Sequence, residues 1–145
     1  MFELVRSARF DDTRATARAH VPADLPFLAD HFPGVPVLPG SWQIELCAQI
    51  AGPLAESACG AERWAFLGMI RNATFHAVVP LPAELEITAE VRRVEPSTVV
   101  VAVTASRGET LCCRAELVMM MREAEPEWAD AIATARARVA RWSIA

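Results

Sequence analysis

Segment 41–58, SWQIELCAQIAGPLAESA, has the pattern of a helix that is apolar on nearly every face. A helix without a wide polar stripe cannot lie on the surface of a globular protein and has to be surrounded by other elements. The flanking segments are strand-like, so a curved sheet is the available cover. We therefore expect a sheet wrapped around this helix. We also expect Pro53 to kink it, because a proline nitrogen cannot donate to the carbonyl of Gln49.

Strand patterns lie on both sides of this helix. Before it, we expect two short strands around a turn at Asp11 and Asp12. After it, β-branched and alternating runs separated by proline and glycine turns predict a series of antiparallel strands. The expected strands are 2–9, 13–20, 64–79, 84–94, 98–105 and 110–121. Strands, one buried helix and then a run of strands is the order of an α+β fold.

The C-terminal segment has a different pattern. Its apolar residues recur at spacings of 4, 3, 4 and 3, which places them on one face of a helix. They are Trp128, Ile132, Ala135, Val139 and Trp142. We divide the chain into one domain over 1–121 and a C-terminal amphipathic helix within 122–145. This helix is expected to pack on the domain or on a second copy of the chain.

Composition excludes several classes of function. The 145 residues carry 14 basic and 18 acidic side chains, a net charge of −4 that argues against nucleic-acid binding. All the basic residues are arginine, so the chain has no lysine for a Schiff base, a pyridoxal cofactor or a phosphate loop. Tyrosine is absent too. Hydrophobic residues make up 53%, enough for a sizeable core.

The cysteines form no CxxC pair and, together with the histidines, no spacing typical of a zinc site. We interpret them as small buried side chains in a reducing cytoplasm, and we expect no metal and no cofactor. No apolar run approaches the roughly 18 residues of a membrane helix, and the N-terminal residues do not resemble a signal peptide. We therefore expect a soluble, cytoplasmic protein. The cysteines and histidines considered for a metal site are Cys47, Cys59, Cys112, Cys113, His20, His31 and His76.

A stiff loop with five prolines, at 22–40, holds His31 and leads into the apolar helix. Glu45 lies on that helix, where burial would disfavour its ionised form. Gln49, four residues further on, is spaced to hydrogen-bond with Glu45. The free N–H groups where the helix begins, at Gly40, suit a carbonyl oxygen that acquires negative charge. These features alone predict a candidate acid/base site.

The stretch HFPGVPVLPGSWQIELCAQIAG resembles the signature of the hotdog-fold 3-hydroxyacyl-(acyl carrier protein) dehydratases of fatty-acid synthesis. That family has a His-Phe-Pro-Gly-x-Pro-x-x-Pro-Gly segment, a Glu fourteen residues after the His, and then an Ala-Gln pair. The matching residues here stand in register without a gap. They are His31, Phe32, Pro33, Gly34, Pro36, Pro39, Gly40, Glu45, Ala48 and Gln49. The resemblance extends more weakly over about 13–121 and implies a hotdog fold, an antiparallel sheet around a long central helix.

The resemblance also implies an activity, the removal of water from a 3-hydroxyacyl thioester to give a trans-2-enoyl thioester. In this interpretation His31 takes the proton from C2, Glu45 protonates the departing hydroxyl, and the N–H of Gly40 polarises the thioester carbonyl. Supporting roles fall to Gln49, Phe32 and Pro39, and Trp42, Phe75 and His76 are candidates for the substrate tunnel. The implied partners are an acyl carrier protein and a second copy of the chain, because the family shares its sites across a homodimer. A trimer of dimers stays open, as do the acyl chain length and the choice between carrier protein and coenzyme A.

The sequence departs from the family in two segments. The Pro-His-Arg segment that precedes the family's first strand is missing. Over 75–83, only the Phe and one Val of the family's next signature are kept without a shift. These departures favour a specialised dehydratase of polyketide, polyene or lipid assembly over the housekeeping enzyme. If a carrier protein docks, arginines must supply the complementary patch, with Arg71, Arg92 and Arg93 as candidates.

The sequence allows two alternatives to dehydration. A hotdog thioesterase would hydrolyse the thioester with a carboxylate-activated water and would not need the His-Phe-Pro-Gly loop. A non-catalytic acyl-carrier-binding module would use the C-terminal helix as its working surface. The presence of both His31 and Glu45, with Gln49 beside the carboxyl, favours the dehydratase.

Overall fold

A computed structural model describes residues 3–60 and 62–144 of the chain, with ten elements of secondary structure in them. In chain order they are β1 (Val5–Phe10), β2 (Arg14–Val21), η1 (Pro26–Leu28), α1 (Gly40–Cys59), β3 (Arg63–Phe75), β4 (Ala83–Val94), β5 (Thr98–Arg107), β6 (Thr110–Glu123), η2 (Pro126–Trp128) and α2 (Ala129–Ile144). Residue 2 of the first expected strand lies outside the described residues. The order of elements confirms the α+β fold.

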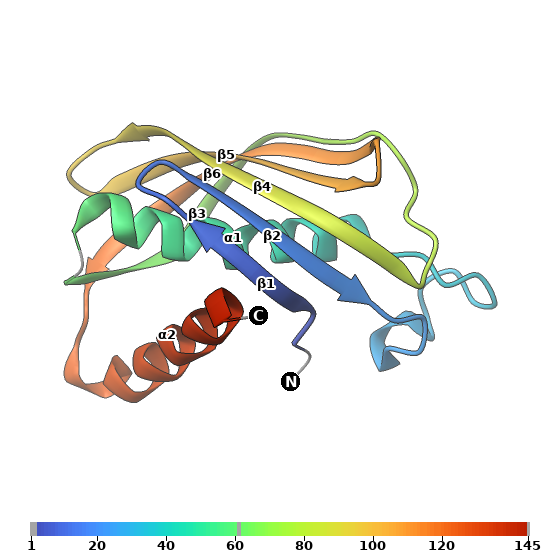
Figure 1. Ribbon diagram of the computed structural model, residues 1–145, viewed down its shortest axis with the longest axis horizontal. Helices are drawn as coiled ribbons and strands as arrows, with labels where there is room; N and C mark the ends of the chain where they lie inside the picture. The colour runs from blue at the N-terminus through green and yellow to red at the C-terminus, as the bar shows by residue number, and fades with distance from the viewer. Residues whose placement is uncertain (1–2, 61, 145) are drawn as a thin grey trace.

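The strands form one antiparallel sheet in the order β1-β2-β4-β5-β6-β3, which curves around α1 (Figure 1). The two edge strands are β1 and β3. The turn between β5 and β6 contains Gly108, whose φ of 58° lies in the left-handed region that glycine adopts without strain. The expected arrangement, a sheet wrapped around a central helix, is therefore confirmed.

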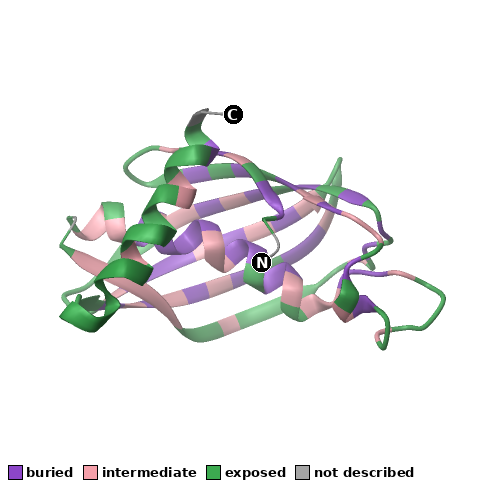
Figure 2. Ribbon diagram, turned by 90° about the horizontal axis from the view of Figure 1, so that it is seen from below, coloured by how far each residue is buried: buried purple, intermediate pink, exposed green. Residues whose placement is uncertain are grey.

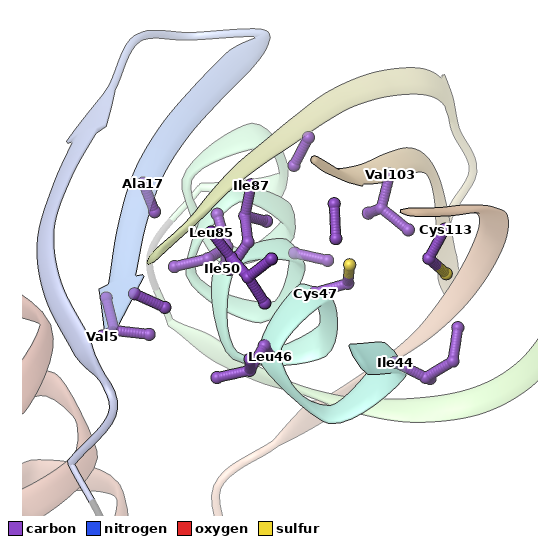
Figure 3. Close-up of a cluster of buried hydrophobic side chains, with 14 of the residues drawn as sticks. Val5, Ala17, Ile44, Leu46, Cys47, Ile50, Leu85, Ile87, Val103 and Cys113 are labelled. Atoms are coloured by element: carbon purple, nitrogen blue, oxygen red, sulfur yellow. The ribbon is translucent and has the colours of Figure 1, made fainter. Parts of the chain in front are cut away.

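The core lies between the concave face of the sheet and α1 (Figure 3). Strand β4 shows why the sequence folds this way, because Leu85 and Ile87 are buried while Glu84 and Glu86 between them are exposed. The alternation puts one apolar face of the strand on the helix. On the helix side, Ile50 is among the side chains with no exposed surface.

The cysteines behave as predicted in the core. Cys47 on α1 and Cys113 on β6 are fully buried, Cys112 is buried, and Cys59 is half-buried. The hydrogen bond of the Cys47 thiol to Cys113 and the burial of Cys47 raise the pKa of Cys47, because each disfavours a thiolate there.

One face of α1 is not covered by the chain, and here the expectation of a helix surrounded on every side was wrong. Ser41 and Glu45 are exposed, and Gln49, Pro53 and Glu56 are only half-buried. These residues recur every three or four positions, so they form one stripe along the helix. The sheet curves around one side of α1 and leaves this stripe on the open side. The helix continues through Pro53 to Cys59.

The strand expected at 64–79 ends earlier, at Phe75. Residues beyond it pair with the loop before α1 instead. Val79 accepts a hydrogen bond from the N–H of Leu38 at 2.9 Å, and Leu81 donates one to the carbonyl of Pro36 at 2.9 Å. Pro80 and Pro82 cannot donate hydrogen bonds to a neighbouring strand, which ends regular pairing in this segment. His76 therefore lies beyond the strand, where the sequence had placed it within one.

The predicted C-terminal helix is present as α2, preceded by the short helix η2. It lies on the open side of α1, opposite the sheet (Figures 1 and 2). At its beginning Trp128 stacks on Trp64 of β3, with ring centroids 6.1 Å apart. Near its end Trp142 is buried, and Arg141 forms an ion pair with Glu3 beside β1. The helix thus spans the opening between the two edges of the sheet.

Candidate active site

The His-Phe-Pro-Gly segment is a tight turn that ends the loop after η1. The N–H of Val35 donates to the carbonyl of Phe32 at 2.9 Å, and Gly34 has a φ of 82°. Proline followed by a residue with positive φ is the pattern of a type II turn. His31 directly precedes this turn and is half-buried, and its ring meets that of Phe32 edge-on at 4.9 Å. Phe32 itself is 65% exposed and has a φ of 52°, which is unusual for a residue other than glycine.

The beginning of α1 is packed against the end of β3. A Cβ atom on Gly40 would lie 2.9 Å from Cε1 of Phe75, so only glycine fits beneath this ring. Pro39 is the N-cap residue of the helix, and its carbonyl accepts hydrogen bonds from the N–H groups of Trp42 and Gln43. The N–H groups of Gly40 and Ser41, the first two residues of the helix, have no partner within the helix itself. Gly40 therefore combines an available N–H with the absence of a side chain.

Glu45 lies one turn further along the uncovered stripe of α1. Its Oε1 accepts a hydrogen bond from the side-chain amide of Gln49 at 3.0 Å, which is the contact that the sequence spacing predicted. The expected burial of Glu45 was wrong for the single chain, because its side chain points to the side that the sheet leaves open. Gln49 thus orients a carboxyl group that the chain by itself leaves accessible.

The structure does not bring His31 and Glu45 together within one chain. Across residues 3–60 and 62–144, no hydrogen bond or ion pair joins them. His31 belongs to the loop before α1, and Glu45 to the helix face that points away from the sheet.

The expected tunnel residues have different surroundings. Trp42 is half-buried and stacks on Phe27 of η1, with ring centroids 4.4 Å apart and an angle of 5° between the rings. Phe75 covers Gly40 and is 47% exposed. His76 is exposed, and its backbone N–H donates to the carbonyl of Cys112 at 2.8 Å. Of these three, Phe75 lies next to the residues with candidate catalytic roles.

A groove of about 440 Å³ between α1 and α2 was not foreseen from the sequence. Glu45 and Gln49 line it, together with residues of β3 and the apolar side of α2. The heptad-like spacing of the C-terminal apolar residues was a usable signal for one wall. The position of that wall relative to α1 depends on packing that no local pattern records.

In the part of the chain that the structure describes, no three His, Cys, Asp or Glu side chains are grouped so that they could hold a metal ion. None of the described helices is both long and apolar enough to cross a membrane.

Solved structures show the same architecture. AziG of S. sahachiroi superposes with a TM-score of 0.68 at 21% identity, over 83% of this chain and 92% of that one. A Streptococcus mutans protein solved with acetyl-CoA bound gives 0.68 at 18%, over 85% and 92%. A thioesterase of Haemophilus influenzae gives 0.63 at 18%, over 79% and 76%. At these identities the likeness is one of fold, and the fold is the hotdog.

Sequence comparison narrows the class. Residues 7–114 match the ApeI-like family, described as ApeI dehydratase. Two 3-hydroxyacyl-[acyl-carrier-protein] dehydratases named FabZ are each 34% identical to the chain. That of Levilactobacillus brevis aligns over 111 residues, 76% of this chain and 75% of the relative. That of Verminephrobacter eiseniae aligns over 121 residues, 80% and 81% respectively. The chain therefore belongs to the ApeI-like dehydratase family, which confirms the resemblance found in the sequence.

Proposed function

We propose that this protein removes water from a 3-hydroxyacyl thioester, carried on an acyl carrier protein, to form the trans-2-enoyl thioester. The hydrogen bond between Gln49 and Glu45 carries the proposal. It orients a carboxyl group on the one face of α1 that is open to a substrate, fourteen residues after His31. The FabZ relatives are named as dehydratases of acyl groups on the carrier protein, which supports the same substrate class here.

The reaction needs a base that takes a proton from C2 and an acid that protonates the hydroxyl leaving C3. The imidazole of His31 removes a proton from C2, and the electron pair left behind forms the double bond to C3. The C–O bond at C3 breaks, and the carboxylic acid of Glu45 protonates the departing hydroxyl so that it leaves as water. Return of the proton from the imidazolium to the carboxylate restores both groups. Histidine suits the first step because it gains and loses protons near neutral pH.

The thioester carbonyl has to be polarised while C2 loses its proton. We assign this to the N–H of Gly40 at the beginning of α1, where the helix dipole also favours negative charge. Phe75 packs over Gly40 and fixes the position of this N–H. The loop that contains Phe32 and Pro39 keeps its place through the hydrogen bonds of Pro36 and Leu38 to the segment after β3.

A second copy of the chain completes the site in this proposal, because His31 and Glu45 do not meet within one chain. The edge strand β3 has hydrogen-bonding groups available along its outer side, since it pairs only with β6 in the sheet. Apolar side chains on and near this edge are exposed: Met69 is 55%, Ile70 46% and Phe75 47% accessible. A copy related by a two-fold axis would cover these side chains. A further association into a trimer of dimers stays open.

The proposed arginines for carrier docking each have a carboxylate partner in their own chain. Arg71 lies 3.2 Å from Glu116, and Arg92 lies 3.2 Å from Glu90. Arg93 lies 2.8 Å from Glu95. An acidic carrier protein would have to compete with these partners. We place the reaction in the cytoplasm and in specialised polyketide, polyene or lipid assembly, as the departures around residues 75–83 favour.

The reverse reaction offers the simplest test. Purified protein is mixed with trans-2-butenoyl pantetheine, and loss of the enoyl absorbance is followed together with release of free thiol. His31→Ala and Glu45→Gln should each reduce hydration by about 10²- to 10⁴-fold, as expected for removal of a general base or acid. His20→Ala and Glu86→Gln, at exposed or half-buried sites on β2 and β4, are the matched controls and should keep the wild-type rate. Thiol release that survives His31→Ala would instead identify a thioesterase.

Sharing of the site between two copies is tested by mixing the two inactive variants. A dimer of one His31→Ala chain and one Glu45→Gln chain keeps one site with both wild-type groups, if the site spans the interface. Random mixing should then restore about a quarter of the wild-type rate. No recovery in a mixture whose subunits have exchanged would contradict the shared site.

A further inference from the structure

The groove between α1 and α2 begins at the candidate acid. Glu45 and Gln49 form its first part, and Glu56 lies at the other end of the same helix stripe. Glu56 is eleven positions after Glu45, so the groove follows α1 for about 16 Å. Its volume of about 440 Å³ falls in the range of small-molecule sites in proteins.

The walls of the groove are apolar along its length. On α1, Ala48 has only a methyl group and Gly52 has no side chain, so neither fills the groove. Trp64 and Phe66 of β3 contribute aromatic rings, and Trp128 stacks on Trp64. A channel of this kind offers a hydrocarbon chain contact on several sides, and each methylene removed from water improves binding by about fourfold.

Polar side chains also line the groove: Glu45 and Gln49 near one end of the α1 stripe, Glu56 near the other, and Arg136 and Arg138 on α2. The carboxyl of Glu45 marks the end where the thioester would react. At the far end Glu56 accepts a hydrogen bond from the backbone N–H of Ala65 at 3.0 Å, and Arg136 of α2 donates to the carbonyl of Arg63 at 3.3 Å. Burial raises the pKa of Glu56, and the N–H of Ala65 and the charge of Arg136 oppose this rise. The polar groups at the far end thus already have hydrogen-bond partners.

Helix α2 forms the wall of the groove opposite α1, and contacts before it, in its middle and near its end hold it in place. Trp128 of η2, just before α2, and Arg136 in the middle of α2 contact β3. Near the end of α2, Trp142 is buried and Arg141 pairs with Glu3 beside β1. The residues between these anchors, such as Ile132, Ala135 and Val139, line the groove and are not fully buried in the single chain. The apolar side of α2 is therefore held at a fixed distance from α1 with space left between them.

We propose that this groove binds the acyl chain of the substrate and that α2 determines which chain lengths are accepted. The proposal rests on the proposed function, because it takes Glu45 as the acid that acts on C3. The chain extends from Glu45 along Ala48 and Gly52 under the aromatic rings of β3. Short acyl groups end before they reach α2, whereas long ones contact it.

The test narrows the groove on the α2 side. Ala135→Phe places a ring in the groove, and Ala133→Phe places the same ring on the exposed helix surface outside it. Hydration of trans-2-butenoyl and trans-2-dodecenoyl pantetheine is measured for wild type and both variants. Ala135→Phe should lower kcat/KM for the long substrate by about tenfold or more and leave the short one within about twofold, since only the long chain loses contacts. Ala133→Phe should change neither value.

Other outcomes would overturn the proposal. An unchanged long-chain rate in Ala135→Phe means that the acyl chain does not use this groove. Equal losses for both substrates, together with a changed oligomeric state, mean that a second copy of the chain fills it. Ala131→Phe, on the same side of the groove, replaces Ala135→Phe if that variant does not fold.

A binding measurement separates this proposal from the proposed function. Dodecanoyl pantetheine with a terminal bromine should quench the fluorescence of Trp64 and Trp128 in wild type and in Ala133→Phe, but much less in Ala135→Phe. If no enoyl thioester is hydrated yet this pattern is found, dehydration is wrong and the acyl groove stands. If hydration occurs without any quenching, the groove proposal is wrong and dehydration stands.

Discussion

The two long helices of this protein differ in how much of their surface is buried. Helix α1 is buried on most of its surface, and a run of its side chains, including Leu46, Ile50 and Leu54, has no exposed area. Helix α2 has an apolar stripe of which only Trp142 is fully covered, while Trp128 at the other end is 48% exposed. The first helix is the centre of the core, and the second spans the opening of the sheet (Figure 2). A groove is left between the two helices.

The difference suggests that α1 mainly serves folding, whereas α2 mainly serves the recognition of a ligand. The core around α1 provides the stability of the domain and positions Gly40 and Glu45. We expect helix α2 to contribute less to stability, because most of its apolar stripe is not fully buried in the single chain.

The largest difference is expected between two isoleucine truncations. Ile50→Ala removes a fully buried side chain from the core and should lower the free energy of unfolding by about 2–5 kcal/mol. Ile132→Ala truncates a half-buried side chain in the groove wall and should cost about 1 kcal/mol or less. Urea unfolding of both variants measures this difference. Equal costs would show that α2 is as much a part of the core as α1.

A smaller effect is expected where α1 meets β3. Gly40→Ala forces the ring of Phe75 to move, because the new Cβ would lie 2.9 Å from it. We expect a loss of about 1–3 kcal/mol in stability together with slower hydration, since the N–H of residue 40 shifts with the ring. Adding Phe75→Leu should recover part of the stability, and a double-mutant cycle measures the coupling. Purely additive effects would contradict the contact.

A pH-dependent effect is expected at Glu56 of α1, which interacts with the charge of Arg136 on α2. Burial raises the pKa of Glu56 above its ordinary value of 4.5, so the folded chain binds this proton more tightly than the unfolded one. The contribution of Glu56 to stability therefore falls as pH rises from about 4.5 through the folded-state pKa, and is constant above it.

Glu56→Gln carries no charge and still offers an oxygen to the N–H of Ala65. Its stability relative to wild type should be nearly unchanged at about pH 4 and should increase toward about pH 7. Urea unfolding at the two pH values tests this. A relative stability that does not vary with pH, or that decreases as pH rises, would show that Arg136 and Ala65 outweigh the cost of burial.

The smallest effect is expected at the end of α2. Arg141 and Glu3 form an ion pair whose side chains are 60% and 45% exposed. Arg141→Ala should cost between about 0 and 1 kcal/mol, and the cost should decrease with added salt. Thermal unfolding at low and high salt measures it. A loss as large as that of Ile50→Ala would mean that this anchor decides whether α2 docks at all.

Much of the fold was predictable because its signals are local. The apolar run of α1, the alternation in β4, the glycine turn at 108 and the periodicity of α2 each depend on neighbours in the sequence. The contact between Gln49 and Glu45 was predictable for the same reason, since residues four apart on a helix face each other. The end of β3 was misplaced because residues 77–79 are apolar enough for a strand, whereas Val79 and Leu81 pair with the loop before α1.

The sequence by itself determined the α+β fold, the helix at the centre, the stiff loop that holds His31 and the identity of the acid/base candidates. Only the tertiary structure decided that Glu45 lies on an uncovered stripe, that His31 does not reach it within one chain, and that α2 leaves a groove open beside it. The physical reason is the curvature of the sheet, which sets how much of α1 is covered. That curvature results from the packing of all six strands, and no single segment encodes it.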